Sequence, residues 1–245
     1  MHVKEYGNKE GPLLLFLHGG GVGGWMWGKQ VDYFTDYHCL VPTLQGHGER
    51  SAESSFSIKG NALEIIELIE ERKNGREVNI VGFSIGAQIT LAIISLAPTL
   101  VQSAVINSAL VLPMKMAIPF IAPAIKLTAP FIKNRTFSKI QAKQLYIDDL
   151  YFEQYYEDSV KMSLYTLIEM LQENMGYELP KNTSDTTTRI LVTVGDKEKG
   201  VMKESAEKIM VSYQDCSCVV ISKVGHGFSF AQPERFNRLI EEWIH

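Results

Sequence analysis

The chain has 245 residues, of which 45% are hydrophobic and 21% are charged, and this composition excludes a disordered chain. Its length is enough for one sizeable core, so one domain with an insertion is expected. The formal net charge of −4, without a concentrated block of Lys and Arg, argues against nucleic acid as a partner.

The N-terminal residues and the cysteines indicate a cellular compartment. Met1–Gly7 contains an acidic residue and no long apolar run, so it does not resemble a secretory signal. Cys39, Cys216 and Cys218 are odd in number and are most simply reduced thiols, which predicts a cytoplasmic location. Cys216 and Cys218 lack further ligands at a suitable spacing, so neither a metal nor another cofactor is expected.

Six short apolar runs bounded by turn residues predict strands that are buried on both faces. These runs are Leu13–Leu17, Cys39–Val41, Val78–Val81, Ala104–Ile106, Ile190–Val194 and Val219–Ile221. Helical patterns lie between several of them, at Leu63–Arg72, Ala87–Ala97, Met202–Met210 and Glu234–Ile244. This alternation predicts an α/β fold, with a mostly parallel sheet and helices on both of its faces.

One stretch breaks the alternation, because residues 113–188 contain no convincing buried strand. We expect an inserted helical cap there, and a core made of residues 1–112 and 189–245. Within the insertion, Ser159–Met175 has the pattern of one helix.

The apolar segment Met114–Ile132 must be compared with a membrane span. Lys115, Lys126 and the repeated prolines interrupt it, so it does not form a continuous apolar helix of the necessary length. No membrane span is predicted, and a cap that lines an apolar pocket fits the segment better.

The clearest chemical motif is Gly82-Phe83-Ser84-Ile85-Gly86, which follows an apolar strand and precedes a helix. This is the context of the G-x-S-x-G turn, in which the serine stands at the apex of a sharp, strained turn. Side chains at Gly82 and Gly86 would collide there. Ser84 is therefore the predicted nucleophile, at a helix N-terminus that favours developing negative charge.

A second glycine cluster, His18-Gly19-Gly20-Gly21-Val22-Gly23-Gly24, follows the first apolar strand. It formally matches a dinucleotide fingerprint, but the next strand offers no acidic residue to hold a ribose. As an HGGG-type loop it would instead supply backbone N–H groups to an oxyanion hole, together with the N–H of Ile85. The second interpretation explains both glycine clusters, and His18 is then structural.

A serine hydroxyl needs a base, and in this motif the histidine follows the serine along the chain. Only His226 and His245 come after Ser84, and His245 is the last residue. We therefore predict His226 as the base, in a loop with small neighbours directly after a strand.

The acid that orients His226 should lie past a strand end between Ser84 and His226. Asp196 and Glu198 both follow the strand Ile190–Val194. Residue type does not decide between them, because either carboxylate can hold the imidazole.

On these motifs the chain resembles the α/β-hydrolase fold family, specifically its cap-bearing, serine esterase-like branch, over nearly the full length. The resemblance implies that a G-x-x-D stretch carries the acid, at Glu198 here, with Glu in place of Asp. It also implies that the N–H of Gly20 contributes to the oxyanion hole. The loop that ends in Gly46-His47-Gly48 lacks the Asp usual in the family, and His47 is expected to be structural.

Together these features predict a carboxylesterase with a small-molecule ester substrate. Apolar residues of the expected cap would form a pocket for a short or medium acyl or alkyl group. The residues considered for it are Met114, Met116, Phe120, Ile121, Phe131, Tyr151, Phe152, Tyr155 and Tyr156. The same fold also hosts carbon–carbon hydrolases, thioesterases, lyases and haloperoxidase-like enzymes, and a non-catalytic ligand-binding relative is a further alternative.

Overall fold

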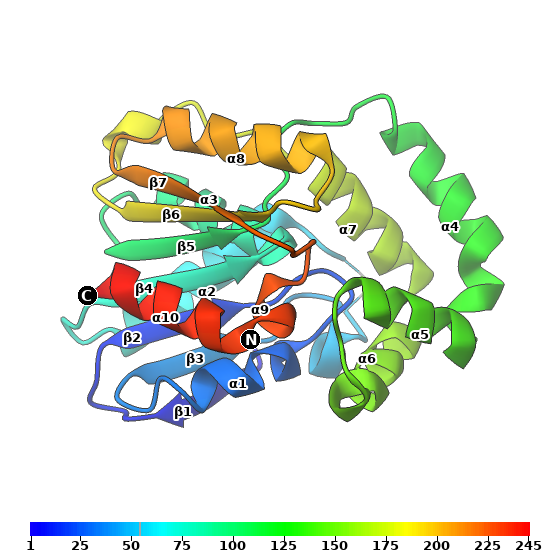
Figure 1. Ribbon diagram of the computed structural model, residues 1–245, viewed down its shortest axis with the longest axis horizontal. Coiled ribbons are helices and arrows are strands. Elements are labelled where there is room, and N and C mark those ends of the chain that lie inside the picture. Colours follow the sequence, from blue (N-terminus) through cyan, green and yellow to red (C-terminus); the bar gives the residue numbers. More distant parts are fainter. Residues whose placement is uncertain (54) are drawn as a thin grey trace.

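The centre of the molecule is one seven-stranded sheet (Figure 1). The structure is a computed structural model that describes residues 1–53 and 55–245. The strand order is β1-β3-β2-β4-β5-β6-β7, and only β1 runs antiparallel to its neighbour. The strands are β1 (Val3–Gly7), β2 (Leu13–Leu17), β3 (His38–Pro42), β4 (Val78–Phe83), β5 (Ser103–Asn107), β6 (Arg189–Gly195) and β7 (Cys216–Ile221).

Helices cover both faces of this sheet (Figure 1). One face carries α2 (Ile58–Arg72), α3 (Ile85–Leu96) and α8 (Gly200–Ser212). The other carries α1 (Gly28–Val31), α9 (Phe228–Ala231) and α10 (Pro233–Ile244). The predicted mostly parallel sheet with helices on both faces is therefore confirmed.

The central strands are apolar throughout because each one faces two cores. Along β2, Leu13, Leu15 and Leu17 belong to the core under α2, α3 and α8, whereas Leu14 and Phe16 belong to the core on the opposite face. All five of these side chains are fully buried. A strand between two helical layers has no polar face, which explains the continuous apolar runs.

The two edge strands differ from the sequence prediction. β1 was not among the predicted strands, because its exposed residues form no apolar run. The prediction that Val219–Ile221 is buried on both faces was wrong, since β7 is an edge strand and Val220 is 56% exposed.

Four helices lie between β5 and β6, beyond the ends of the strands (Figure 1). They are α4 (Ile118–Ile132), α5 (Arg135–Gln144), α6 (Asp149–Lys161) and α7 (Leu164–Gly176), and we call them the α4–α7 segment. The single helix predicted at Ser159–Met175 was wrong. The chain breaks at Met162, and the Ser163 hydroxyl accepts a hydrogen bond from the Thr166 N–H to begin α7.

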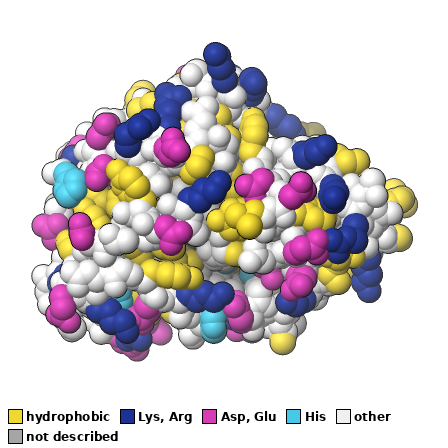
Figure 2. Space-filling model, turned by 60° about the horizontal axis from the view of Figure 1, so that its bottom comes forward, with side chains coloured by type: hydrophobic (Ala, Val, Ile, Leu, Met, Phe, Trp, Pro, Cys, Tyr) yellow, Lys and Arg dark blue, Asp and Glu magenta, His cyan; other side chains and the backbone are white. Residues whose placement is uncertain are grey.

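Helix α4 forms despite its prolines, but its 15 residues are fewer than a membrane span needs, as the sequence predicted. Pro119 is in the first turn, where a missing N–H costs little. Pro123 and Pro130 lie on the exposed side, where water can hydrate the carbonyl groups that they leave unpaired. At the right of Figure 2, the end of the molecule formed by this segment shows hydrophobic side chains beside Lys and Arg. Among the described residues, no helix is long and apolar enough to cross a membrane.

Candidate active site

Ser84 lies between the end of β4 and the first residue of α3. Its φ of 55° is in the left-handed region, which is strained for a residue with a side chain. A Cβ on Gly82 would lie 2.5 Å from the Gly86 carbonyl oxygen, and a Cβ on Gly86 would lie 2.3 Å from the Leu17 carbonyl oxygen. The first glycine allows the turn itself, and the second allows α3 to pack against the end of β2.

His226 lies on the loop that follows β7, and its ring reaches Ser84. The distance from His226 Nε2 to Ser84 Oγ is 3.0 Å, which is a hydrogen bond. The ring also packs on Phe83, with ring centroids 4.9 Å apart. Two residues predicted from separate arguments, a local motif and chain order, are thus in direct contact.

The carboxylate beside His226 belongs to Glu198. Its Oε2 lies 2.8 Å from His226 Nδ1, and the Glu198 side chain is only 2% exposed. Asp196 points elsewhere, because its Oδ1 accepts the Val224 N–H at 3.2 Å and the residue is exposed. The structure therefore brings Glu198, and not Asp196, into contact with the imidazole.

The second oxygen of Glu198 is held by two further donors. Oε1 accepts the Ser108 hydroxyl at 2.7 Å and the Gly195 N–H at 2.9 Å. Burial raises the pKa of Glu198, but the hydrogen bond from His226, the charge of that ring and these two donors outweigh it, so the pKa lies below its usual value. The carboxylate is thus kept ionised although it is buried.

Sequence reasoning missed Ser108, which follows β5 directly. It has a φ of 57°, and only its position past a strand end, at the same sheet edge as Ser84, could have indicated it.

The glycine loop after β2 passes beside Ser84. A Cβ on Gly19 would lie 3.5 Å from the Ser84 Cβ, and a Cβ on Gly20 would lie 2.7 Å from the Met170 sulfur. The Gly21 N–H donates to His47 Nε2 at 3.2 Å, whereas the Gly20 N–H has no acceptor in the described part of the chain. Ile85 is the first residue of α3, so its N–H has no acceptor within the helix.

His18 and His47 fix the backbone of this glycine loop through hydrogen bonds. The Leu44 N–H donates to His18 Nε2, and His18 Nδ1 donates to the Gly19 carbonyl, at 3.1 Å and 2.9 Å. Burial lowers the pKa of His18 to about 3 and that of His47 to about 4. Both rings are therefore neutral near pH 7, and both have structural partners, as their sequence contexts predicted.

An apolar cavity of about 320 Å³ begins at Gly20 and Gly21 and extends under the α4–α7 segment. Its wall is formed mainly by Ile125, Ile132, Phe137, Leu145, Tyr155, Met162, Leu167, Met170 and Leu171. Of the nine residues that the sequence suggested, only Tyr155 is among these. Phe120 and Phe131 were wrong because the helical period of α4 directs them outward, with exposures of 71% and 53%. Met116 was also wrong, since it lies in the turn before α4 and is 90% exposed.

Comparison with known proteins places this geometry in a family. The model of a family described as "Alpha/beta hydrolase family" matches residues 14–239. The chain belongs to the alpha/beta hydrolase family.

Individual relatives of this hydrolase carry different names. The (E)-2-((N-methylformamido)methylene)succinate hydrolase of Acinetobacter baylyi is 25% identical over 99% of this chain and 93% of its own length. Among solved structures, an esterase from Exiguobacterium antarcticum matches with a TM-score of 0.84 and 18% identity, over 99% of this chain and 94% of its own. A bromoperoxidase from Bacillus anthracis matches with a TM-score of 0.83 and 15% identity, over 99% of this chain and 94% of its own. At these identities, the solved structures establish the fold alone.

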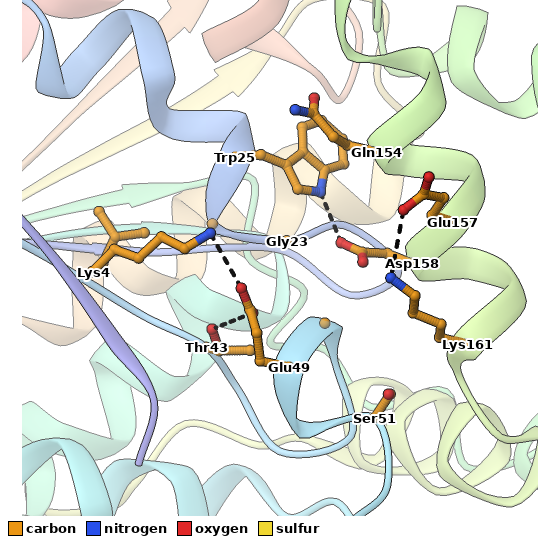
Figure 3. A pocket seen from close by; sticks show the side chains of 13 residues that line it. Lys4, Gly23, Trp25, Thr43, Glu49, Ser51, Gln154, Glu157, Asp158 and Lys161 are labelled. Carbon is orange, nitrogen blue, oxygen red and sulfur yellow. Dashed lines mark hydrogen bonds and ion pairs between the residues drawn. The ribbon is translucent and has the colours of Figure 1, made fainter.

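A second cavity of the hydrolase, of about 440 Å³, lies at the junction of α6 with the core (Figure 3). Trp25 Nε1 donates to Asp158 Oδ2 at 2.8 Å, and Lys4 pairs with Glu49 at 3.2 Å. Burial raises the pKa of the Asp158 carboxyl. Neither Ser84, His226 nor Glu198 lines this cavity. The Trp25–Asp158 hydrogen bond fastens α6 to the core, whereas the Lys4–Glu49 pair lies within the core.

Among residues 1–53 and 55–245, no three His, Cys, Asp or Glu side chains are grouped so that they could hold a metal ion. The three cysteines are free thiols.

Proposed function

We propose that this hydrolase cleaves carboxylic esters that carry an apolar acyl or alkyl group of short or medium length, through an acyl-enzyme on Ser84. The observation that carries the proposal is the hydrogen-bonded series from Ser84 Oγ through His226 to Glu198. A hydroxyl, an imidazole and a buried carboxylate in this order are the groups required for nucleophilic acyl transfer.

In the proposed reaction, His226 Nε2 takes the Ser84 proton as Oγ attacks the ester carbonyl carbon. The tetrahedral intermediate collapses when its bond to the alcohol oxygen breaks, and His226 returns the proton to the departing alcohol. Water then attacks the acyl-enzyme, with His226 again as the base, and releases the carboxylic acid and free Ser84. Glu198 keeps the imidazole oriented and stabilises its charged form.

The oxyanion of the intermediate is assigned to the N–H groups of Gly20 and Ile85. Both belong to backbone that is fixed before the substrate arrives, Gly20 by the loop on His18 and His47 and Ile85 by α3. Donors that need no rearrangement stabilise developing charge most effectively.

The α4–α7 segment is proposed as the cap, residues 113–188, that selects the substrate. Its apolar cavity starts at Gly20, next to the expected position of the ester carbonyl, and is lined by hydrophobic side chains. Neither Lys nor Arg is among the residues that line it, so this cavity suits an uncharged acyl or alkyl group. Lys197 and Lys199 line a separate cavity beside His226 and Glu198.

The test is labelling with a fluorophosphonate, followed by hydrolysis of p-nitrophenyl esters of increasing chain length. The wild-type chain is expected to be labelled at Ser84 and to show a maximum of kcat/KM at a short or medium chain. Ser84→Ala should lose labelling and at least about 10³-fold in kcat, with an unchanged circular dichroism spectrum.

Two results would contradict the proposal. Near-normal ester hydrolysis by Ser84→Ala would exclude Ser84 as the nucleophile. Labelling at Ser84 without turnover of any ester would instead favour another reaction of the family.

A further inference from the structure

The outward side of α4 carries an apolar face that is largely exposed, although Phe131 packs on Phe137 of α5 with ring centroids 6.0 Å apart. Phe120, Ala124, Leu127 and Phe131 stand at i, i+4, i+7 and i+11, so they share one side of the helix. Phe120 is 71% exposed and Leu127 is 78% exposed. Met116, just before the helix, continues the same exposed apolar surface. We call these five residues the α4 face.

The stretch of chain that carries the α4 face is basic. Residues 113–147 contain six basic residues and no acidic residue, although the whole chain has a formal net charge of −4. The basic residues are Lys115, Lys126, Lys133, Arg135, Lys139 and Lys143. Acidic residues resume only at Asp148 and Asp149, where α6 begins.

Only some of these cations are neutralised within the molecule. Lys115 pairs with Glu178, and Arg135 pairs with Glu153. Within residues 1–53 and 55–245, Lys126, Lys133 and Lys143 make no ion pair. At the right of Figure 2, hydrophobic side chains lie beside Lys and Arg, with Asp and Glu side chains among them.

We infer that the α4 face docks on the surface of an anionic phospholipid bilayer. Bulky apolar side chains bordered by lysines match an interface in which acyl chains lie beneath anionic headgroups. A second copy of the chain is a poorer occupant, because two basic faces would repel each other. Nucleic acid is also poorer, since the apolar centre of the face has no partner on a phosphate backbone.

The size of α4 fits a helix that lies in the plane of the interface. Its 15 residues extend over about 22 Å, which is shorter than the hydrocarbon core of a bilayer, about 30 Å. The opposite side of α4 contributes Ile125 and Ile132 to the apolar cavity. Docking would therefore bring that cavity close to the lipid phase.

The experiment is co-sedimentation of the full chain with vesicles of phosphatidylglycerol and phosphatidylcholine, compared with vesicles of phosphatidylcholine alone. Binding is expected to the anionic vesicles and to weaken with salt. Leu127→Ser should reduce the affinity about tenfold. Lys126→Gln and Lys133→Gln should each reduce it about fivefold, on anionic vesicles only.

Two controls keep the result specific. Val211→Ser alters a side chain on α8 that is 77% exposed, nearly the same as Leu127, and should bind like the wild type. Ser84→Ala should also bind like the wild type, because docking needs no catalysis, so failure of the proposed function and failure of docking are distinguishable.

Three outcomes would overturn the inference: no binding to anionic vesicles, equal weakening by Val211→Ser and Leu127→Ser, or a dimer of the wild type that Leu127→Ser dissociates without any vesicle binding. The last would make the α4 face a contact between copies of this chain. Static light scattering during gel filtration measures it.

Discussion

The side chain of Glu198 is one methylene group longer than the Asp that the family usually has at this position, and the local backbone accommodates the extra length. Its N–H donates to the Gly195 carbonyl at 3.1 Å, and its Oε1 returns to accept the Gly195 N–H. This local turn directs the longer side chain back toward the strand end, where Oε2 meets His226. The Ser108 hydroxyl completes the arrangement, so the carboxylate has little freedom to rotate.

The two neighbouring carboxylates should therefore respond differently to removal of their charge. Glu198→Gln is expected to lower kcat by about 10⁴-fold, because the imidazole loses the group that fixes its tautomer and stabilises its charged form. Asp196→Asn should keep near-normal activity, since the Asp196 carboxylate accepts the Val224 N–H whereas the imidazole contacts Glu198. Ester kinetics of both variants measure this, and equal losses would rule out Glu198 as the acid.

Much of the arrangement around Ser84 could be predicted from sequence, because short sequence motifs identify the residues that take part in it. Ser84 and His226 follow from a strand–turn–helix motif and from chain order. The choice between Asp196 and Glu198 stayed open until the resemblance to the family favoured Glu198, because it depends on the direction of a side chain after a turn. Ser108 belongs to no motif, and its contact with Glu198 depends on the pairing of β5 with β6.

At the scale of elements, the loop that carries His226 is joined to the α4–α7 segment. The Gly225 N–H donates to the hydroxyl oxygen of Tyr146 at 2.9 Å. The Leu145 carbonyl oxygen lies so near Gly227 that a Cβ there would come within 2.1 Å of it. The small residues around His226 therefore allow the backbone between α5 and α6 to approach the loop closely.

A side chain at Gly227 should disturb this contact. Gly227→Ala is expected to lower both kcat and the melting temperature Tm, because the new methyl group must displace the Leu145 backbone or the His226 loop. Gly200→Ala is the matched control. Its Cβ would meet only Glu204 Oε1, at 3.6 Å, and should leave both quantities unchanged. Unaltered kcat and Tm in Gly227→Ala would show that the contact is not needed.

The regular elements were easier to predict than their faces. Buried strands such as β2 and β4 have a continuous apolar pattern that no solvated element shares. The helices of the α4–α7 segment have apolar residues on more than one side, since α4 is apolar toward both the cavity and the solvent. Periodicity alone therefore could not tell which aromatic and methionine side chains line the cavity.

At the scale of the whole molecule, two buried neutral histidines link the fold to pH. His18 and His47 have pKa values of about 3 and about 4 in the folded chain, against about 6.5 for an unperturbed histidine. Between about pH 4 and pH 6.5, these two histidines are therefore protonated to a greater extent in the unfolded chain than in the folded chain. The stability that these rings contribute is complete above about pH 6.5 and is lost as the pH falls toward their folded values.

The free energy of unfolding should therefore fall as the pH is lowered from about 6.5 to about 4.5, by up to about 1.4 kcal/mol per pH unit for each of these histidines. His47→Gln should reduce by about one the number of protons taken up on unfolding, and so make the free energy of unfolding depend less steeply on pH. Urea unfolding across this range measures the slopes, and identical slopes for His47→Gln and the wild type would contradict the assignment.

The contact of Leu145 and Tyr146 with the His226 loop has a consequence for the activity of a molecule in which the α4–α7 segment has moved. If the α4–α7 segment swung away from the sheet, it would withdraw the Tyr146 hydroxyl from Gly225 and the Leu145 backbone from Gly227. The base would lose its support at the moment when water gained access to Ser84. A molecule opened in this way should therefore be less active than one in which the two contacts are kept.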